Sequence, residues 1–478
     1  MKSRRKFLKT AGLGVGAVWA GSNAVQAAVP FPENPGERPQ RGAGLSIGNP
    51  YGGRVPVTFV IDDSTTLVNM GHFCIPQFKE AWSRSKPGQY DVPWQEWPRE
   101  ISDDFVKKFG DFCRSEGVKG KYSIVPYPAM VGWVDREIPG WTRKQLVESR
   151  NLVRDFMMPD WDIHPEMISH TRVIDIKTGR PLPQRENGGY WMENGGWCAG
   201  KSVDEIADYI EYALQILKNA ELPCEGFTTP GGFGNPAKEF LETAGFQAIR
   251  SVFPETEIPH YFKYVVTSSK ESVAPRVENA KGIDGDNCEC LVNLPSCTGD
   301  WFGRWHGGAP NPVEETVDRH IGPDFKTGRM VEVIEAGEPA AFLTHWPGMY
   351  CNGNETGFKS FQGVVKRLNQ AYGEKIQWMK MSEIARYWAA KELTDLQMIG
   401  DEVKILAPFP APGVTLKIAL EGIFGRPVLN VPGRDPRPLE KVDPERWRPL
   451  QAGEYRIHRK EAEICFDLPK GRSSISQS

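Results

Sequence analysis

Two adjacent carboxylates, Asp62 and Asp63, directly follow the apolar run Val57-Thr58-Phe59-Val60-Ile61. Carboxylates where a buried strand ends are costly unless a positive charge lies between or beside them. One of the two could then bind a cation while the other stays free as a base. Alone, such a pair is more typical of a turn or a helix cap, so the case for a cation depends on what ends the other strands.

Two of the chain's eight histidines, His164 and His170, lie at the end of another apolar run. His164 ends the run, and His170 is close enough in sequence to fold back toward the strand end. This placement predicts a metal pair; the alternative is two unrelated loop histidines. Asp162 shares a strand face with His164, and Glu166 lies four residues before His170, so either carboxylate could fix an imidazole as an outer partner.

A third histidine and a glycine-rich turn follow two further apolar runs. His345 ends the run 340–344 and precedes Trp346, where it could act as an acid beside a tryptophan wall. Thr229 and Pro230 open a turn rich in glycine that brings backbone close to the centre of a site. No Lys-Ser or Lys-Thr follows this turn, which excludes a P-loop.

The elements that must position these residues alternate between apolar runs and amphipathic helical stretches. Ser102 and Gly117 bracket one predicted helix, and Ser202 with Glu205 forms a capping box that opens another. The pattern predicts an α/β fold, either a parallel barrel or an open doubly wound sheet, with the site at the carboxyl ends of the strands. The predicted strands are 55–61, 121–125, 161–164, 226–229, 247–252, 341–345 and 376–379.

The two ends of the chain differ from this alternating region. Residues 1–27 combine a basic start that includes Arg4-Arg5 with a short apolar stretch and small residues at 25–27, which predicts a twin-arginine signal and export to the periplasm. A general secretory signal is the alternative. Residues 28–53 are expected to be a leader rich in proline and glycine. Short β runs after residue 395 predict a small all-β accessory domain over 395–470.

Composition excludes some classes of function. The 478 residues carry 58 Lys+Arg against 61 Asp+Glu, a net charge of -3, which argues against a general nucleic-acid binder. No apolar run reaches about 18 residues, so no membrane span is predicted. Nine cysteines are consistent with export, and one disulfide is expected from the cluster Cys288, Cys290 and Cys297.

Taken together, the motifs resemble those of the polysaccharide deacetylase family, with its NodB-homology or carbohydrate esterase family four fold. Asp62-Asp63, the two histidines 164 and 170, Thr228-Thr229-Pro230, Asp300-Trp301 and Leu343-Thr344-His345 follow the family's order over residues 54–392. The resemblance implies a distorted parallel (β/α)7-type barrel. Two departures are plain: five residues separate the histidines where the family usually has three, and Thr228 stands where the family usually has an arginine.

The resemblance also implies a reaction. Asp62 would be the base, His345 the acid, and Asp63, His164 and His170 the ligands of a divalent metal ion, expected to be zinc. The reaction would be hydrolysis of an acetamide or an acetate ester on a glycan. A catalytically silent metal- and glycan-binding protein and a metal-dependent amidase acting on a small non-sugar amide are the alternatives.

Candidate substrate contacts lie at the strand ends and in the glycine-rich stretch 172–200. Trp191 and Trp197 in that stretch could stack on sugar faces, or could clamp the loop onto the barrel. The full set of expected substrate contacts is Thr229, Pro230, Trp301, Trp346, Trp191 and Trp197.

Overall fold

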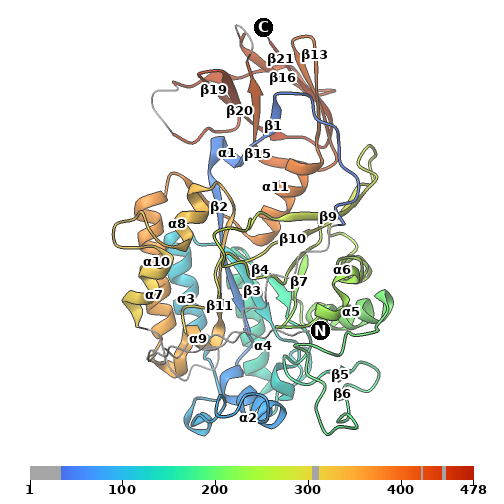
Figure 1. The fold of residues 1–478 in the computed structure, drawn as a ribbon, viewed down its shortest axis with the longest axis vertical. Coiled ribbons are helices and arrows are strands. Elements are labelled where there is room, and N and C mark those ends of the chain that lie inside the picture. Colours follow the sequence, from blue (N-terminus) through green and yellow to red (C-terminus); the bar gives the residue numbers. More distant parts are fainter. Residues whose placement is uncertain (1–33, 304–311, 421–423, 444–447, 478) are drawn as a thin grey trace, which may run out of the picture. The chain divides into compact units, whose positions relative to one another are not determined.

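Strand β2 (Val55–Asp62) is flanked by other strands in a parallel sheet (Figure 1). The computed structural model describes residues 34–303, 312–420, 424–443 and 448–477. Every residue of β2 is buried, which explains why its sequence is continuously apolar rather than alternating. The predicted α/β class with a parallel sheet is confirmed. The partner strands are β3 (Gly120–Ile124), β4 (Trp161–Pro165), β11 (Ala340–His345) and β12 (Ile376–Trp378).

A second sheet continues from β4. A parallel bridge between Glu166 and Thr228 connects β4 to β7 (Gly226–Thr228). Strand β7 pairs in parallel with β8 (His260–Phe262), and β8 pairs in parallel with β10 (Glu289–Asn293), whose other neighbour is the antiparallel β9 (Arg276–Lys281). Beyond β10, the amide of Cys297 donates to the carbonyl of Ala341 on β11 at 2.6 Å. The carboxyl ends of these parallel strands therefore lie near one another.

The helices begin and end largely where the capping signals predict. Ser102 caps α3 (Asp103–Glu116) and Gly117 ends it with a positive φ, while Ser202 and Glu205 form the expected capping box of α5 (Val203–Asn219). Figure 1 shows α3 beside α10 on one side of the parallel strands, and α5 beside α6 on the other. The other helices are α1 (Pro50–Gly53), α2 (Met70–Trp82), α4 (Arg143–Leu152), α6 (Lys238–Val252), α7 (Val313–His320), α8 (Arg329–Glu335), α9 (Trp346–Tyr350), α10 (Thr356–Tyr372) and α11 (Met381–Leu393).

One predicted strand is wrong. Residues 247–252 belong to α6, and the strand that follows β7 is β8. Gly245 lies inside this helix, where a Cβ would collide with the ring of Phe227. The buried positions of α6, among them Leu241, Ala248 and Val252, recur at helical rather than strand spacing.

The C-terminal residues form two five-stranded sheets, to which the N-terminal segment contributes. Strand β1 (Leu45–Ile47), within the stretch expected to be a leader, pairs antiparallel with β15 (Ala411–Ala419). One hydrophobic cluster includes residues of α11 and of both C-terminal sheets. The other strands of these sheets are β13 (Asp395–Ile399), β14 (Glu402–Ala407), β16 (Pro427–Asn430), β17 (Arg437–Pro438), β18 (Glu440–Lys441), β19 (Glu454–His458), β20 (Glu461–Leu468) and β21 (Gly471–Gln477).

The cysteines do not form the expected disulfide. All nine lie in the described part of the chain and are buried, and Cys288, Cys290 and Cys297 are free thiols. The sulfur of Cys297 faces Met330 Sδ at 3.7 Å rather than another thiol. Among the described residues, no helix is long and apolar enough to cross a membrane.

Candidate active site

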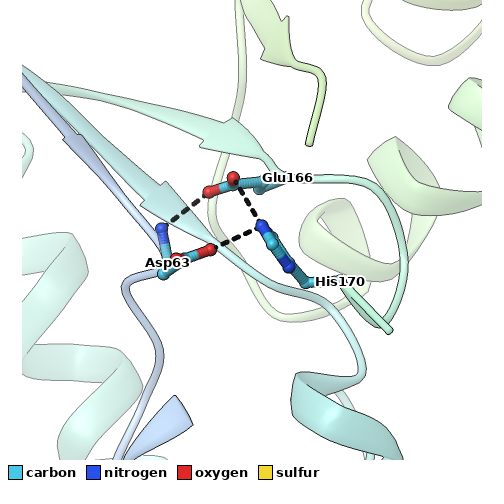
Figure 2. Close-up of side chains that lie close together, drawn as sticks. All are labelled: Asp63, Glu166 and His170. Carbon is cyan, nitrogen blue, oxygen red and sulfur yellow. Dashed lines mark hydrogen bonds and ion pairs between the residues drawn. The ribbon is translucent and has the colours of Figure 1, made fainter. Parts of the chain in front are cut away.

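Asp63, Glu166 and His170 form a buried cluster at the carboxyl ends of β2 and β4 (Figure 2). His170 Nε2 lies 2.8 Å from Asp63 Oδ1 and 3.4 Å from Glu166 Oε1. The amide of Asp63 donates to Glu166 Oε2 at 2.7 Å, which fixes the two carboxylates relative to each other. Two carboxylates and one imidazole thus converge on one point.

The backbone at this cluster is strained. Asp63 has a φ of 57° and His170 a φ of 59°, in the left-handed region that residues other than glycine avoid. Such conformations cost about 1–3 kcal/mol each and persist only where the surrounding structure holds them in place. Strain of this kind is concentrated at functional sites, and here it sets the direction of two of the three converging side chains.

The three residues fit a divalent cation. Asp63 is fully buried; His170 Nε2 lies 2.8 Å from its Oδ1, and its Oδ2 accepts no hydrogen bond from the described residues. A buried carboxylate oxygen without a hydrogen bond is costly unless a cation lies beside it. Carboxylate oxygens and an imidazole nitrogen are donors that zinc and manganese accept. Asp63, Glu166 and His170 would therefore be the protein ligands.

The charges within the cluster compensate one another in the absence of a metal ion. Burial raises the pKa of Asp63, and the charge of His170 opposes that rise. Burial also opposes ionisation of Glu166, but hydrogen bonding and the charge of His170 outweigh it and lower its pKa to about 2. The pKa of His170, which burial alone would lower, is held well above its usual value by the two carboxylates. The imidazolium thus supplies the positive charge that a cation would replace.

Asp62, the expected base, forms a buried ion pair that the sequence analysis missed. Lys121 on β3 is completely buried and contacts Asp62 Oδ1, and it also donates to Ser123 Oγ at 2.7 Å and to the carbonyl of Ile61 at 3.2 Å. Burial raises the pKa of Asp62 to about 6, while the ammonium of Lys121 opposes the rise. Lys121 therefore supplies, from a neighbouring strand, a cation beside the carboxylate that precedes Asp63.

His345, the expected acid, is oriented by Asp300. Its Nδ1 lies 2.8 Å from Asp300 Oδ2, and its Nε2 lies 4.0 Å from Asp63 Oδ2. Burial lowers the pKa of His345, but the hydrogen bond and charge of Asp300, with the charge of Asp63, outweigh burial and raise it to about 9. At neutral pH this histidine therefore carries a proton on the nitrogen that faces the cluster.

The structure does not bring His164 to Asp63 and His170. His164 is completely buried, with Nε2 2.9 Å from His260 Nε2 and Nδ1 3.3 Å from Thr228 Oγ1. Burial lowers its pKa well below the usual value. His164 precedes Glu166 by two residues. Because each residue of a strand advances the chain by about 3.3 Å, the side chain of His164 lies farther from the carboxyl end of β4 than the side chain of Glu166. Glu166, which the sequence analysis considered only as an outer partner, occupies the place expected for His164.

Several expected substrate contacts lie in the core or pack against other protein groups. Trp346 is only 1% exposed and contacts the rings of Phe105, Phe109 and Tyr122, so it offers no face to a ligand. Pro230 and Thr229 are buried, and the amide of Thr229 donates to the carbonyl of Phe262 at 3.2 Å. These positions shape the wall of the fold rather than an open surface.

The remaining three tryptophans are partly exposed. The ring of Trp197 lies 4.5 Å from that of Tyr209 and 6.2 Å from that of Phe233, which favours the clamp over the sugar-stacking role. Trp191 and Trp301 each have a guanidinium over the ring, at 3.8 Å from Arg185 and 3.7 Å from Arg319 respectively.

Comparison with known proteins gives only distant similarities. No protein-family model matches the sequence, and no curated protein matches it significantly. A CE4 family pseudoenzyme from Bacillus anthracis has 11% identity over 71% of this chain and 68% of its own, with a TM-score of 0.31. A protein named as a glycoside hydrolase/deacetylase from Parabacteroides distasonis has 11% identity over 86% and 92%, with a TM-score of 0.38. A 4-alpha-glucanotransferase from Thermococcus litoralis has 15% identity over 69% of this chain but 40% of its own, with a TM-score of 0.32. Similarities of this size carry no argument about function, which must come from the residues of the site.

Proposed function

We propose that this chain is a metal-dependent hydrolase that removes N- or O-linked acetyl groups from a polysaccharide or a related glycan. The observation that carries the proposal is the convergence of three units: the cluster of Asp63, Glu166 and His170, the pair of Asp62 with Lys121, and the pair of His345 with Asp300. A metal site, a base and an acid at the carboxyl ends of parallel strands are the parts that acyl hydrolysis needs.

We further propose that the parallel strands form a distorted barrel of the polysaccharide deacetylase type, with residues 395–470 as an accessory β domain. The support is the strand order. The Glu166–Thr228 bridge joins the two parallel sheets, and the hydrogen bond from Cys297 to Ala341 joins the segment after β10 to β11. The motif order over residues 54–392 agrees with this arrangement.

Asp63, Glu166 and His170 would hold the metal ion, which we propose to be zinc; manganese is the alternative, since a ligand set with two carboxylates also suits it. When bound, such an ion polarises an acyl carbonyl and lowers the pKa of a water molecule. Asp62 takes the proton of the attacking water, and a pKa of about 6 leaves it mainly ionised at neutral pH. Lys121 holds Asp62 in place without occupying its second oxygen.

His345 donates a proton to the leaving amine or alcohol. It is protonated at neutral pH because its pKa is about 9, and Asp300 fixes the ring through Nδ1 so that Nε2 carries the transferable proton. The imidazole is 22% exposed, so it can be reached from solvent, whereas Asp63 cannot.

The test is release of acetate by the metal-loaded full chain from N-acetylated and O-acetylated glycans. Asp62→Asn should abolish release while keeping the metal, and exposed Asp155→Asn should leave the rate unchanged. Turnover of a cyclic amide but of no glycan would favour the amidase. A metal-loaded protein that hydrolyses none of these substrates would contradict the proposal and favour a silent binding protein.

We also propose export by a twin-arginine route, supported by Arg4-Arg5 within a basic start. The signal, residues 1–27, lies outside the described residues. Cell fractionation tests this proposal: wild type should reach the exported fraction, and a variant with both arginines replaced by lysine should not. Equal export of the two would support a general secretory signal.

A further inference from the structure

The carboxylate of Glu193 binds the turn that carries His170. Its side chain is buried, and its Oε2 accepts hydrogen bonds from the amide of His170 at 2.7 Å and from the amide of Ser169 at 3.1 Å. The hydroxyl of Tyr209, on α5, donates to Oε1. All three donors converge on one side chain whose sequence position gives no indication of this role.

The chain after His170 folds back to bring Glu193 to this place. It runs outward through the short strands β5 (Ile174–Asp175) and β6 (Arg180–Pro181), then returns beside its own start. On the return, Arg172 forms an antiparallel bridge with Met192, and the amide of Glu193 donates to the carbonyl of Thr171 at 2.9 Å. The backbone pairing therefore fixes Glu193 directly beside the turn.

We infer that Glu193 is a positioning residue for the metal centre, which holds the His170 turn in its left-handed conformation so that Nε2 faces Asp63 and Glu166. The inference rests on the proposed function, because it takes His170 to be a metal ligand. A left-handed histidine is costly, and hydrogen bonds from its own amide and the preceding one to a carboxylate compensate that cost. Without them, the turn relaxes toward a common conformation and the imidazole leaves its place.

Glu193 has no salt bridge with a lysine or arginine in the part of the chain that the structure describes, and burial raises its pKa to about 8. A buried carboxyl group held only by two amides and a hydroxyl is costly, and an apolar side chain would pack there at lower cost. Its hydrogen bonds to the backbone of a metal ligand give this carboxyl group a role that offsets the cost.

The test compares metal affinity with thermal stability in the metal-free full chain. Glu193→Met, which keeps the length of the side chain but has no oxygen to accept from the two amides, is titrated with Zn²⁺ and with Mn²⁺ by calorimetry, and its melting temperature is measured without metal. The matched control is Glu278→Met: Glu278 is also buried, and it accepts from the hydroxyl of Tyr261 at 2.9 Å and from Asn293 Nδ2 at 3.2 Å, away from the metal cluster. Both variants should melt at lower temperature than wild type.

We expect Glu193→Met to weaken metal affinity about 10- to 100-fold, as loss of an outer partner of a metal ligand does, and Glu278→Met to change it less than twofold. Equal affinities in Glu193→Met and wild type would overturn the inference while leaving the proposed function intact. A wild-type protein that binds neither ion would overturn both. If Glu193→Met does not fold, Glu193→Asp serves instead: its shorter carboxyl group cannot reach both amides, so an unchanged affinity would again overturn the inference.

Discussion

Replacement of Lys121 by methionine isolates the electrostatic contribution of the buried ion pair with Asp62. Methionine keeps most of the volume of the lysine stem but removes the ammonium, so Asp62 loses the one lysine with which it forms a salt bridge among the described residues. Hydrogen bonds to Ser123 and to the carbonyl of Ile61 are lost as well, and the buried acceptors left behind cost about 1–3 kcal/mol at any pH.

The pH-dependent part of the effect follows from the pKa of Asp62. Burial already raises this pKa to about 6 in the metal-free protein, and it rises further once the opposing charge of Lys121 is gone. A carboxyl whose folded pKa exceeds its unfolded value of about 3.9 loses stability as the pH rises from the unfolded to the folded pKa. In wild type, the free energy of unfolding stops falling for this reason near pH 6. In Lys121→Met it keeps falling by about 1.4 kcal/mol per pH unit, or up to about 2.7 kcal/mol between pH 6 and pH 8.

The assay is urea unfolding of metal-free protein, followed by tryptophan fluorescence at pH 6, 7 and 8. Lys404→Met is the matched control: Lys404 also lies on a strand and pairs with Glu402, but its side chain is 48% exposed, and we expect less than about 0.5 kcal/mol at every pH. A difference between Lys121→Met and wild type that does not grow with pH would refute the reasoning about Asp62.

Three further outcomes follow from the site. Metal affinity should rise with pH, because only the neutral imidazole of His170 binds a metal and the two carboxylates, against the effect of burial, hold its pKa well above the usual value. Calorimetry in buffers of different protonation enthalpy should detect about one proton released per metal ion bound. Hydrolysis should fall as the pH rises through about 9, where His345 loses its proton, and Asp300→Asn should move this alkaline limb to lower pH; an unmoved limb in the pH–rate profile would contradict the acid role. Trp197→Ala should lower the melting temperature by several degrees with glycan affinity unchanged, since the ring packs on two aromatic side chains, and the reverse pattern would favour a sugar contact.

The residues that directly follow a strand could be predicted from the sequence. The run before Asp62 has the continuous apolar character of a strand buried on both faces, and parallel strands of one sheet end at the same edge. The register confirms the consequence, since His345 on β11 stands opposite Asp62 on β2. The base and acid candidates therefore lie at one edge of the sheet, as their positions after apolar runs indicated.

The candidate metal ligands were harder to predict, because they depend on how far along a strand each side chain lies. His164 and Glu166 are on the same face of one strand, so periodicity alone does not separate them. Only the pairing of β4 with its neighbours places Glu166 at the level of Asp63. The residue-type preference for histidine pointed to His164, whereas the cluster that the structure shows contains Glu166.

Partners distant in sequence were missed for a related reason. Lys121 stands at the start of an apolar run, and that lone charge in a buried strand was the one signal that it has a buried partner. Glu193 carried no such signal, because its contact with His170 depends on how the intervening loop folds back. Trp346 was placed beside His345 by sequence adjacency, but neighbouring residues at a strand end point to opposite sides, and its ring lies in the core.

The metal content of three folded proteins tests the central claim most directly. Wild type, Glu166→Ala and His164→Gln are each loaded with zinc, dialysed and analysed for metal per chain. We expect one ion per chain in wild type, loss of that ion in Glu166→Ala, and its retention in His164→Gln, whose amide can still hydrogen-bond to His260. Retention in Glu166→Ala together with loss in His164→Gln would contradict the assignment of the site to Asp63, Glu166 and His170.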